Sequence, residues 1–351
     1  MIVQNNYLTK EQKANAVQRL TALWAFTESG LGGIMHALQI PFTGLLVGGM
    51  AVIMISLIAG ISEKNYKHVL KSAMIVLIVK AMVSPHTPVP AYIAVAFQAL
   101  LGYGLFSLIK VNFLSIVLLS TISMVESAIQ KLLILTLFFG KSLWKAMDEM
   151  ITLLTKQFGS VVANGSYWII GIYLLIYVAG GFFIAWLAYR TIKNFSAEKN
   201  VFTLQAASGI NNHTSTEKIP FKKRYQKLWL LIGALITLSV MLFVFAADKK
   251  QGLLAVVKTI SWTLSAILIW YMLIGPLFTK AIQKFLHKKQ SRYSDEVLKT
   301  LSFLPVLRNL TTLAWQKSRL YSGFRRWYFF FTALIHATLI YSEPVISENN
   351  L

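Results

Sequence analysis

Long apolar runs separated by short polar breaks dominate the chain. An α-helix rises about 1.5 Å per residue, so about 20 apolar residues cross the hydrocarbon core of a bilayer. The pattern therefore predicts an all-α polytopic membrane protein. The expected spans are residues 21–38, 43–62, 69–84, 91–109, 113–139, 166–189, 228–247 and 253–279, followed by a short apolar run at 327–341.

A polar segment divides these runs into two groups. Residues 191–227 are rich in Ser, Asn, Thr, Gly and Lys, a composition typical of a linker. We therefore expect a six-helix membrane bundle at 1–190 and a C-terminal unit of two or three spans at 228–351. That unit combines a membrane hairpin, cytoplasmic amphipathic helices at 281–326 and the run at 327–341. This last run is so short that it either crosses the membrane or stays on one side of it.

The basic residues predict the orientation. Residues 190–227 hold eight Lys and Arg and residues 280–326 hold eleven, and such loops stay on the cytoplasmic side. Successive spans cross the membrane in opposite directions. Counting back from these cytoplasmic loops therefore puts the N-terminus in the cytoplasm and residues 85–90 and 140–165 outside. The expected location is the cell inner (plasma) membrane.

Two segments are too polar to cross. Residues 140–165 carry apolar side chains at helical spacing opposite charged ones, which predicts an amphipathic helix at the interface. In 281–326, Ser294 followed by two acids indicates a helix start, and Pro305 should break or kink the helix. That segment is available either to a soluble partner or to anionic lipid.

Composition narrows the function. The chain is 56% hydrophobic and 13% charged, whereas soluble domains carry about a quarter charged residues. Its net charge of +21 follows from the basic loops, so the bilayer is the expected partner and nucleic acid is not. It has no cysteine, which excludes disulfides and thiolate metal sites, and we expect no cofactor. It also lacks a GxxxxGK[ST] motif, so any ATP hydrolysis must come from a partner.

Polar residues inside the spans are the candidate site, because such residues are costly in lipid and tend to be functional. Lys80 is placed to neutralise Glu28 or Glu126. His36 and His86 are both expected near the outer mouth, where they would ligate a divalent metal, bind an organic solute, or merely occupy a Pro-rich turn. The candidate ligands are Glu28, His36, His86, Gln98, Glu126 and Gln130.

The first span also carries small residues at every fourth position, a pattern that lets helix backbones approach closely in lipid. The partner is either another span of this chain or another subunit. The small residues expected to serve helix packing or subunit docking are Thr21, Ala25, Ser29 and Gly33.

This first helix and the segments "IPFTGLLVGG" (40–49) and "FQALLGYG" (97–104) carry a resemblance to a known family. Over about residues 15–190, the chain resembles the substrate-binding S component of energy-coupling factor (ECF) transporters. In that family small residues, here Ala25, Ser29 and Gly33, dock onto a coupling subunit that paired cytoplasmic ATPases drive. The chain departs from the family in lacking the N-terminal Met-His pair of its metal branch. Its 281–326 segment also lacks the Ala-Arg-Gly signatures of the coupling subunit.

These observations lead to one expected function with two alternatives. We expect a non-enzymatic membrane component that binds and imports a small solute, vitamin-like or metal, with energy from partner subunits. One alternative is an assembly or scaffold subunit that recruits a cytoplasmic partner through its basic segment. The other is a membrane-embedded enzyme on a lipid-soluble substrate, with Glu126 or His36 as general base. A secondary transporter is less favoured because the halves show no inverted repeat.

Overall fold

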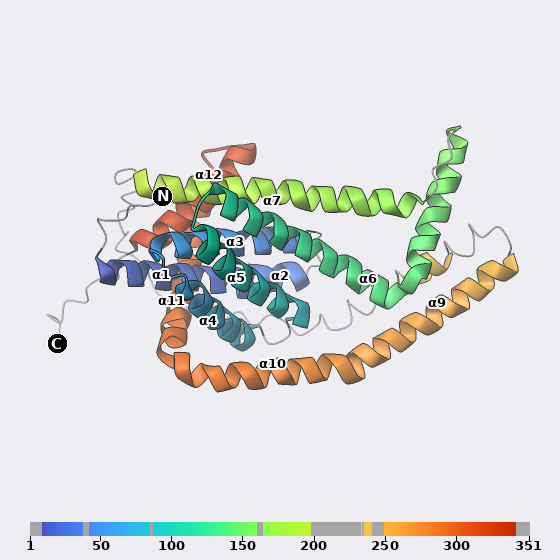
Figure 1. Ribbon diagram of the computed structural model, residues 1–351, viewed down its shortest axis with the longest axis horizontal. Coiled ribbons are helices and arrows are strands. Elements are labelled where there is room, and N and C mark those ends of the chain that lie inside the picture. Colours follow the sequence, from blue (N-terminus) through green and yellow to red (C-terminus); the bar gives the residue numbers. More distant parts are fainter. Residues whose placement is uncertain are drawn as a thin grey trace. The chain divides into compact units, whose positions relative to one another are not determined.

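A computed structural model describes residues 9–37, 42–84, 87–159, 164–197, 233, 235–240 and 249–341. Every regular element within these ranges is a helix, which confirms the all-α prediction (Figure 1). Within these described ranges, five stretches are long and apolar enough to cross a membrane, which supports a multi-pass membrane protein. They are Thr43–Ile61, Val89–Ile109, Phe113–Gln157, Gly165–Lys193 and Val256–Ser318.

The chain forms two compact units. Unit 1 comprises Met1–Ser120, Phe182–Thr214 and Leu286–Leu351, and unit 2 comprises Thr121–Gly181 and Ser215–Phe285. This grouping differs from the division into 1–190, 191–227 and 228–351, which stays a prediction. Residues 198–227, most of the expected linker, lie outside the described part, and of the span expected at 228–247 only 233 and 235–240 are described, as helix.

Unit 1 is built around its first helix. This helix, α1, packs against α3, α4, α11 and α12, while α5 packs against α3 and α4. Gly102 of α5 is close enough to α3 that a Cβ there would lie 2.6 Å from Ile55 Cγ2. The helices are α1 (Lys10–Phe26), a π-helical turn η1 (Thr27–Leu31), α2 (Gly32–Ala37), α3 (Thr43–Ile61), α4 (Lys67–Val83), α5 (Val89–Ile109), α11 (Ser294–Ser318) and α12 (Gly323–Ile340).

The first helix begins about ten residues before the apolar run that predicted it. Thr9 accepts a hydrogen bond from the Gln12 backbone, and Gln12 Oε1 accepts one from the Thr9 backbone, so a capping box starts α1 ahead of Lys10. Hydropathy marks only the apolar part of a helix, so the span expected from residue 21 onward gave no sign that the helix itself begins at Lys10. α4, with 17 residues, matches the span expected at 69–84 closely.

The C-terminal helices belong to the same unit as the N-terminal ones. Arg19 of α1 donates a hydrogen bond to the Leu339 carbonyl of α12 (2.9 Å), and Lys71 of α4 pairs with Glu296 of α11 (2.6 Å). α11 starts at Ser294 as predicted, but it runs unbroken through Pro305. Of the break or kink predicted at Pro305, the break is therefore wrong. Packing of α11 against α1, α4 and α12 stabilises a helix that the proline alone would weaken.

Unit 2 is organised by a bent helix. α6 (Phe113–Gln157) is interrupted at Gly140, whose φ of 64° and ψ of −162° are not helical. The Trp262 indole donates to the Leu137 carbonyl (3.0 Å), a group next to this interruption. The amphipathic helix expected within 140–165 is the segment of α6 that follows the bend. The other helices that lie wholly or partly in unit 2 are α7 (Gly165–Ala197), whose residues from Phe182 on belong to unit 1, α9 (Lys249–Ile269), a π-helical turn η2 (Trp270–Ile274) and α10 (Gly275–Gln290), whose last residues from Leu286 on belong to unit 1.

Candidate functional site

A buried ion pair joins η1, which follows α1, to α4, and so connects the first and third of the spans expected from the sequence. Lys80 Nζ is 2.6 Å from Glu28 Oε2, and the two side chains are only 3% and 4% exposed. A charge taken out of water is costly unless it is paired. The pairing of Lys80 with Glu28, one of the two partners considered from the sequence, is therefore what allows both charges to be buried.

Glu28 is carried by an irregular turn. The α-helix changes to a π-helix over Thr27–Leu31, a rare geometry that is often found at functional sites. This turn packs against α3 and α4. Directly after it, Gly32 comes close to α3, because a Cβ at this position would lie 3.4 Å from Val47 Cγ1. The turn thus sets the Glu28 carboxylate against the helix that carries Lys80.

The ammonium group has a second neighbour in Tyr92. Lys80 Nζ lies 5.8 Å from the centre of the Tyr92 ring, within the range of a cation–π contact. Tyr92 follows the connection between α4 and α5, where Thr87 donates a hydrogen bond to Ser84 (2.9 Å). The basic partner is therefore held between a carboxylate from η1 and an aromatic ring from α5.

Several buried polar atoms of unit 1 have no hydrogen-bond partner among the described residues. Those on the N-terminal helices of this unit are Trp24 Nε1 on α1, Ser29 Oγ on η1, Ser56 Oγ on α3 and Gln98 Oε1 on α5. Buried polar atoms are nearly always bonded, so each of these needs water or another polar group. Trp24 and Ser29 flank Glu28 in the sequence, at one turn and one residue, which places hydrogen-bonding capacity next to the ion pair.

The small-residue stripe of the first span packs inside the chain. Thr21, Ala25 and Ser29 are buried, and the Thr21 hydroxyl donates to Ser72 of α4 (2.7 Å). Gly33 is half-buried, and a Cβ there would lie 3.5 Å from Ser84 Oγ. The close approach that small residues permit is thus used within unit 1, chiefly against α4.

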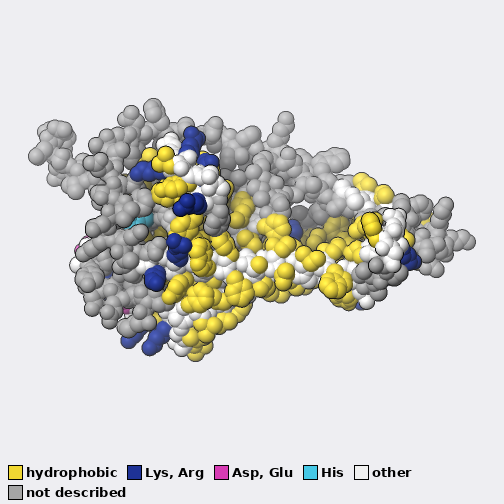
Figure 2. Space-filling view, turned by 90° about the horizontal axis from the view of Figure 1, so that it is seen from above, with side chains coloured by type: hydrophobic (Ala, Val, Ile, Leu, Met, Phe, Trp, Pro, Cys, Tyr) yellow, Lys and Arg dark blue, Asp and Glu magenta, His cyan; other side chains and the backbone are white. Residues whose placement is uncertain are grey.

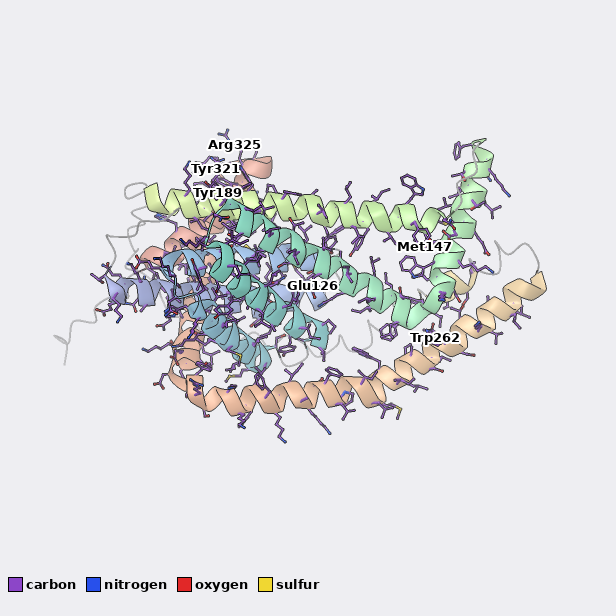
Figure 3. All side chains as sticks on the ribbon, viewed as in Figure 1. Glu126, Met147, Tyr189, Trp262, Tyr321 and Arg325 are labelled. Carbon is purple, nitrogen blue, oxygen red and sulfur yellow. The ribbon has the colours of Figure 1, made fainter. Side chains whose placement is uncertain are left out.

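Glu126 and Gln130 form a separate pair. Both lie on α6 in unit 2, where Figure 3 labels Glu126. The Gln130 amide donates a hydrogen bond to Glu126 Oε1. The other carboxyl oxygen of Glu126 is buried and has no partner among the described residues. Of the six candidate ligands, the structure therefore brings Glu126 to Gln130, whereas Glu28 is joined to Lys80.

The side chains of the two candidate histidines lie outside the described part of the structure. His86 lies outside the described residues, and for His36 only the backbone, in α2, is described. Among the described residues no group of three His, Cys, Asp or Glu side chains is placed to hold a metal ion.

One participant was missed by reasoning from the sequence. Tyr92 is a tyrosine in an apolar span, which is common, and only the packing of α5 on α4 shows that it lies beside Lys80. The available signal was the tight Pro-rich connection at 84–90, which forces the start of α5 close to the end of α4.

Comparisons of the chain with protein family models, with curated proteins and with solved structures give no match.

Proposed function

We propose that this protein is the solute-binding membrane component of a transport system, and that its N-terminal helices bind a small organic solute at the Glu28–Lys80 pair for import. Partner subunits supply the energy. The buried pair is the observation that carries the proposal.

A buried ion pair is a poor device for stability. Replacing such a pair by apolar residues of similar size is often neutral or stabilising. Intramembrane charges are therefore interpreted first as functional groups. Here the pair is combined with a π-helical turn and with unpartnered polar atoms on neighbouring helices, Ser29 and Gln98 among them.

The pair also suggests the class of solute. Lys80 already neutralises Glu28, which disfavours a lone metal cation at this carboxylate. An incoming solute that separates the pair must satisfy both charges. A molecule with an acidic group for Lys80 and a basic or hydrogen-bond donating group for Glu28 does this without leaving a net charge in the membrane. Tyr92 would add a ring for an apolar part of the solute.

The resemblance to ECF S components supports transport but not their mode of docking. In that family the small residues of the first helix contact the coupling subunit, whereas Thr21, Ala25 and Ser29 are buried in this chain. We therefore do not extend the docking role to these residues, and a coupling subunit would have to bind elsewhere.

The test is a thermal-shift screen of the purified full chain in detergent against vitamins, vitamin precursors, amino acids and divalent metals. Hits are then repeated on the double variant Glu28→Gln/Lys80→Met. The matched control is Lys13→Met/Glu63→Gln, which removes an ion pair of similar length (2.5 Å) from the surface. Glu126→Gln and His36→Ala/His86→Ala test the remaining candidates.

We expect a zwitterionic organic solute to raise the melting temperature of the wild type and of the Lys13/Glu63 control, but not of the Glu28/Lys80 variant. A hit that stabilises the Glu28/Lys80 variant equally would remove the site from the proposal. If nothing binds and a protein copurifies at fixed stoichiometry, the assembly-subunit interpretation replaces transport.

A further inference from the structure

The junction of α11 and α12 forms a cationic tip, defined here as residues 317–327. α11 ends at Ser318, and the chain turns back through Gly323, whose φ of 57° favours glycine. Lys317, Arg319 and Arg325 are exposed on this turn. Three cationic side chains are thus gathered within nine residues, at a sharp reversal of the backbone.

Nothing nearby in the sequence neutralises the tip. Residues 297–342 contain no Asp or Glu. The nearest upstream acid on the same helix, Glu296, is paired with Lys71. A surface of this kind attracts an anionic partner. The basic residues of the stretch are Lys299, Arg308, Lys317, Arg319, Arg325 and Arg326.

The cations are interleaved with exposed apolar side chains. Leu320 is 86% exposed, Trp327 52% and Tyr321 40%. A site for a soluble anion has no need of such groups. Side chains that combine an apolar body with a polar end are favoured at the boundary between lipid and water, and cations beside them can reach the phosphates.

Neighbouring aromatic residues place the tip at such a boundary. Arg190 near the end of α7 lies 5.3 Å from the Trp186 ring and 5.1 Å from the Tyr328 ring, which joins α7 to α12. Tyr189 packs edge-on against Phe113 at the start of α6 (5.3 Å). Trp and Tyr gather at membrane–water interfaces, and α7 is one of the five membrane-length stretches.

The figures show the same grouping. Tyr189, Tyr321 and Arg325 lie at the same end of unit 1 (Figure 3). Lys and Arg side chains gather beside apolar ones on the face that includes α12 and the end of α7 (Figure 2).

The tip is also held in place from inside. The Arg326 guanidinium lies 4.3 Å from the Trp315 ring, and Trp315 contacts Trp327 (5.5 Å) and the buried Phe330 (5.4 Å). This cluster fixes the first turn of α12 on the last turns of α11. The exposed cations therefore start from an ordered backbone, which lowers the entropy lost when they bind a ligand.

We propose that the 317–327 tip binds the headgroups of anionic phospholipids in the leaflet at this interface, with Lys317, Arg319 and Arg325 contacting phosphate and Leu320 and Trp327 entering the acyl-chain boundary. This inference does not depend on the proposed transport function. It would anchor α11 and α12, and with them α1, to the membrane surface.

The test titrates the full chain in detergent with phosphatidylglycerol or with phosphatidylcholine of the same acyl chains, and measures bound lipid by native mass spectrometry. The variant is Lys317→Gln/Arg319→Gln/Arg325→Gln. The control is Lys10→Gln/Lys64→Gln/Lys67→Gln, which removes the same charge from exposed lysines elsewhere in unit 1. Each basic residue near an anionic surface changes affinity by roughly fivefold, so three change it by roughly 100-fold.

We expect the wild type and the control to prefer phosphatidylglycerol, and the tip variant to lose roughly 100-fold in affinity for it together with the preference. The single variant Arg325→Gln should lose roughly fivefold in affinity for phosphatidylglycerol. It tests the proposal even where the triple variant does not fold. Leu320→Ala should weaken both lipids equally. Equal phosphatidylglycerol binding by the wild type and the tip variant overturns the proposal. So does an equal loss in the control, or competition by free glycerol phosphate as strong as by the lipid.

Discussion

Removing one partner of the Glu28–Lys80 pair should destabilise the protein far more than removing both. The change Lys80→Met keeps a side chain of similar length but takes away the charge, and Glu28→Gln does the same for the carboxylate. Both groups are at least 96% buried, and their charged atoms are 2.6 Å apart. Each single change therefore leaves its former partner as an uncompensated charge in the interior.

The expected sizes follow from that burial. Breaking a buried pair at one end costs about 3–5 kcal/mol, whereas replacing both ends by apolar groups of similar size is neutral or stabilises by about 1–4 kcal/mol. Additivity would give the double variant a loss of about 6–10 kcal/mol. We expect it instead to lose at most about 1–3 kcal/mol, the cost of the buried amide that Glu28→Gln leaves without a partner, because neither charge remains buried alone.

The assay is equilibrium unfolding of the four proteins in mixed micelles of a mild detergent and increasing sodium dodecyl sulfate, followed by far-UV circular dichroism. The double-mutant cycle isolates the coupling between the two groups. Single variants that lose less than about 1 kcal/mol, the range of exposed ion pairs, would refute the claim that the pair is desolvated. A double variant with the additive loss would show that the two groups act independently.

Two further changes test the packing of unit 1. Gly102→Ala should destabilise the protein by about 1–3 kcal/mol in the same unfolding assay, because its Cβ would lie 2.6 Å from Ile55. The control Gly104→Ala, whose Cβ would have nothing within 4 Å, should be neutral or stabilising. Equal effects of the two changes would contradict the close approach of α5 to α3. Thr21→Val should cost about 1–3 kcal/mol, because it leaves the buried Ser72 hydroxyl without the Thr21 hydroxyl that lies 2.7 Å away. Thr21→Ser keeps a hydroxyl and should retain most of the stability. Equal stability of the two variants would argue against this hydrogen bond.

The membrane helices could be predicted well because their signal is local. A run of apolar residues long enough for a bilayer defines a helix, and α3, α5 and α7 begin within two residues of the positions expected from hydropathy. Helix ends outside the apolar run are set by other interactions. Thr9 starts α1 through a capping box, which the apolar run beginning at residue 21 did not indicate. Pro305 lowers the stability of α11 locally, but tertiary packing outweighs it.

The site was predictable only in its chemistry. A buried carboxylate is costly without a partner, so Lys80 could be named from the sequence as the group that neutralises Glu28 or Glu126. Whether it paired with Glu28 or with Glu126 could not be decided, because both carboxylates are compatible with the order of the spans. The structure decided it by placing η1 against α4.

The sequence by itself determined that the chain is a helical membrane protein, because hydropathy and charge act residue by residue. Tertiary structure decided what lies next to what: that the small-residue stripe is buried inside unit 1, that Tyr92 adjoins Lys80, and that α11 and α12 pack on α1 some 300 residues earlier (Arg19 to Leu339 spans 320 positions). Such contacts depend on how helices fit together, and between distant segments no single stretch of sequence encodes that fit.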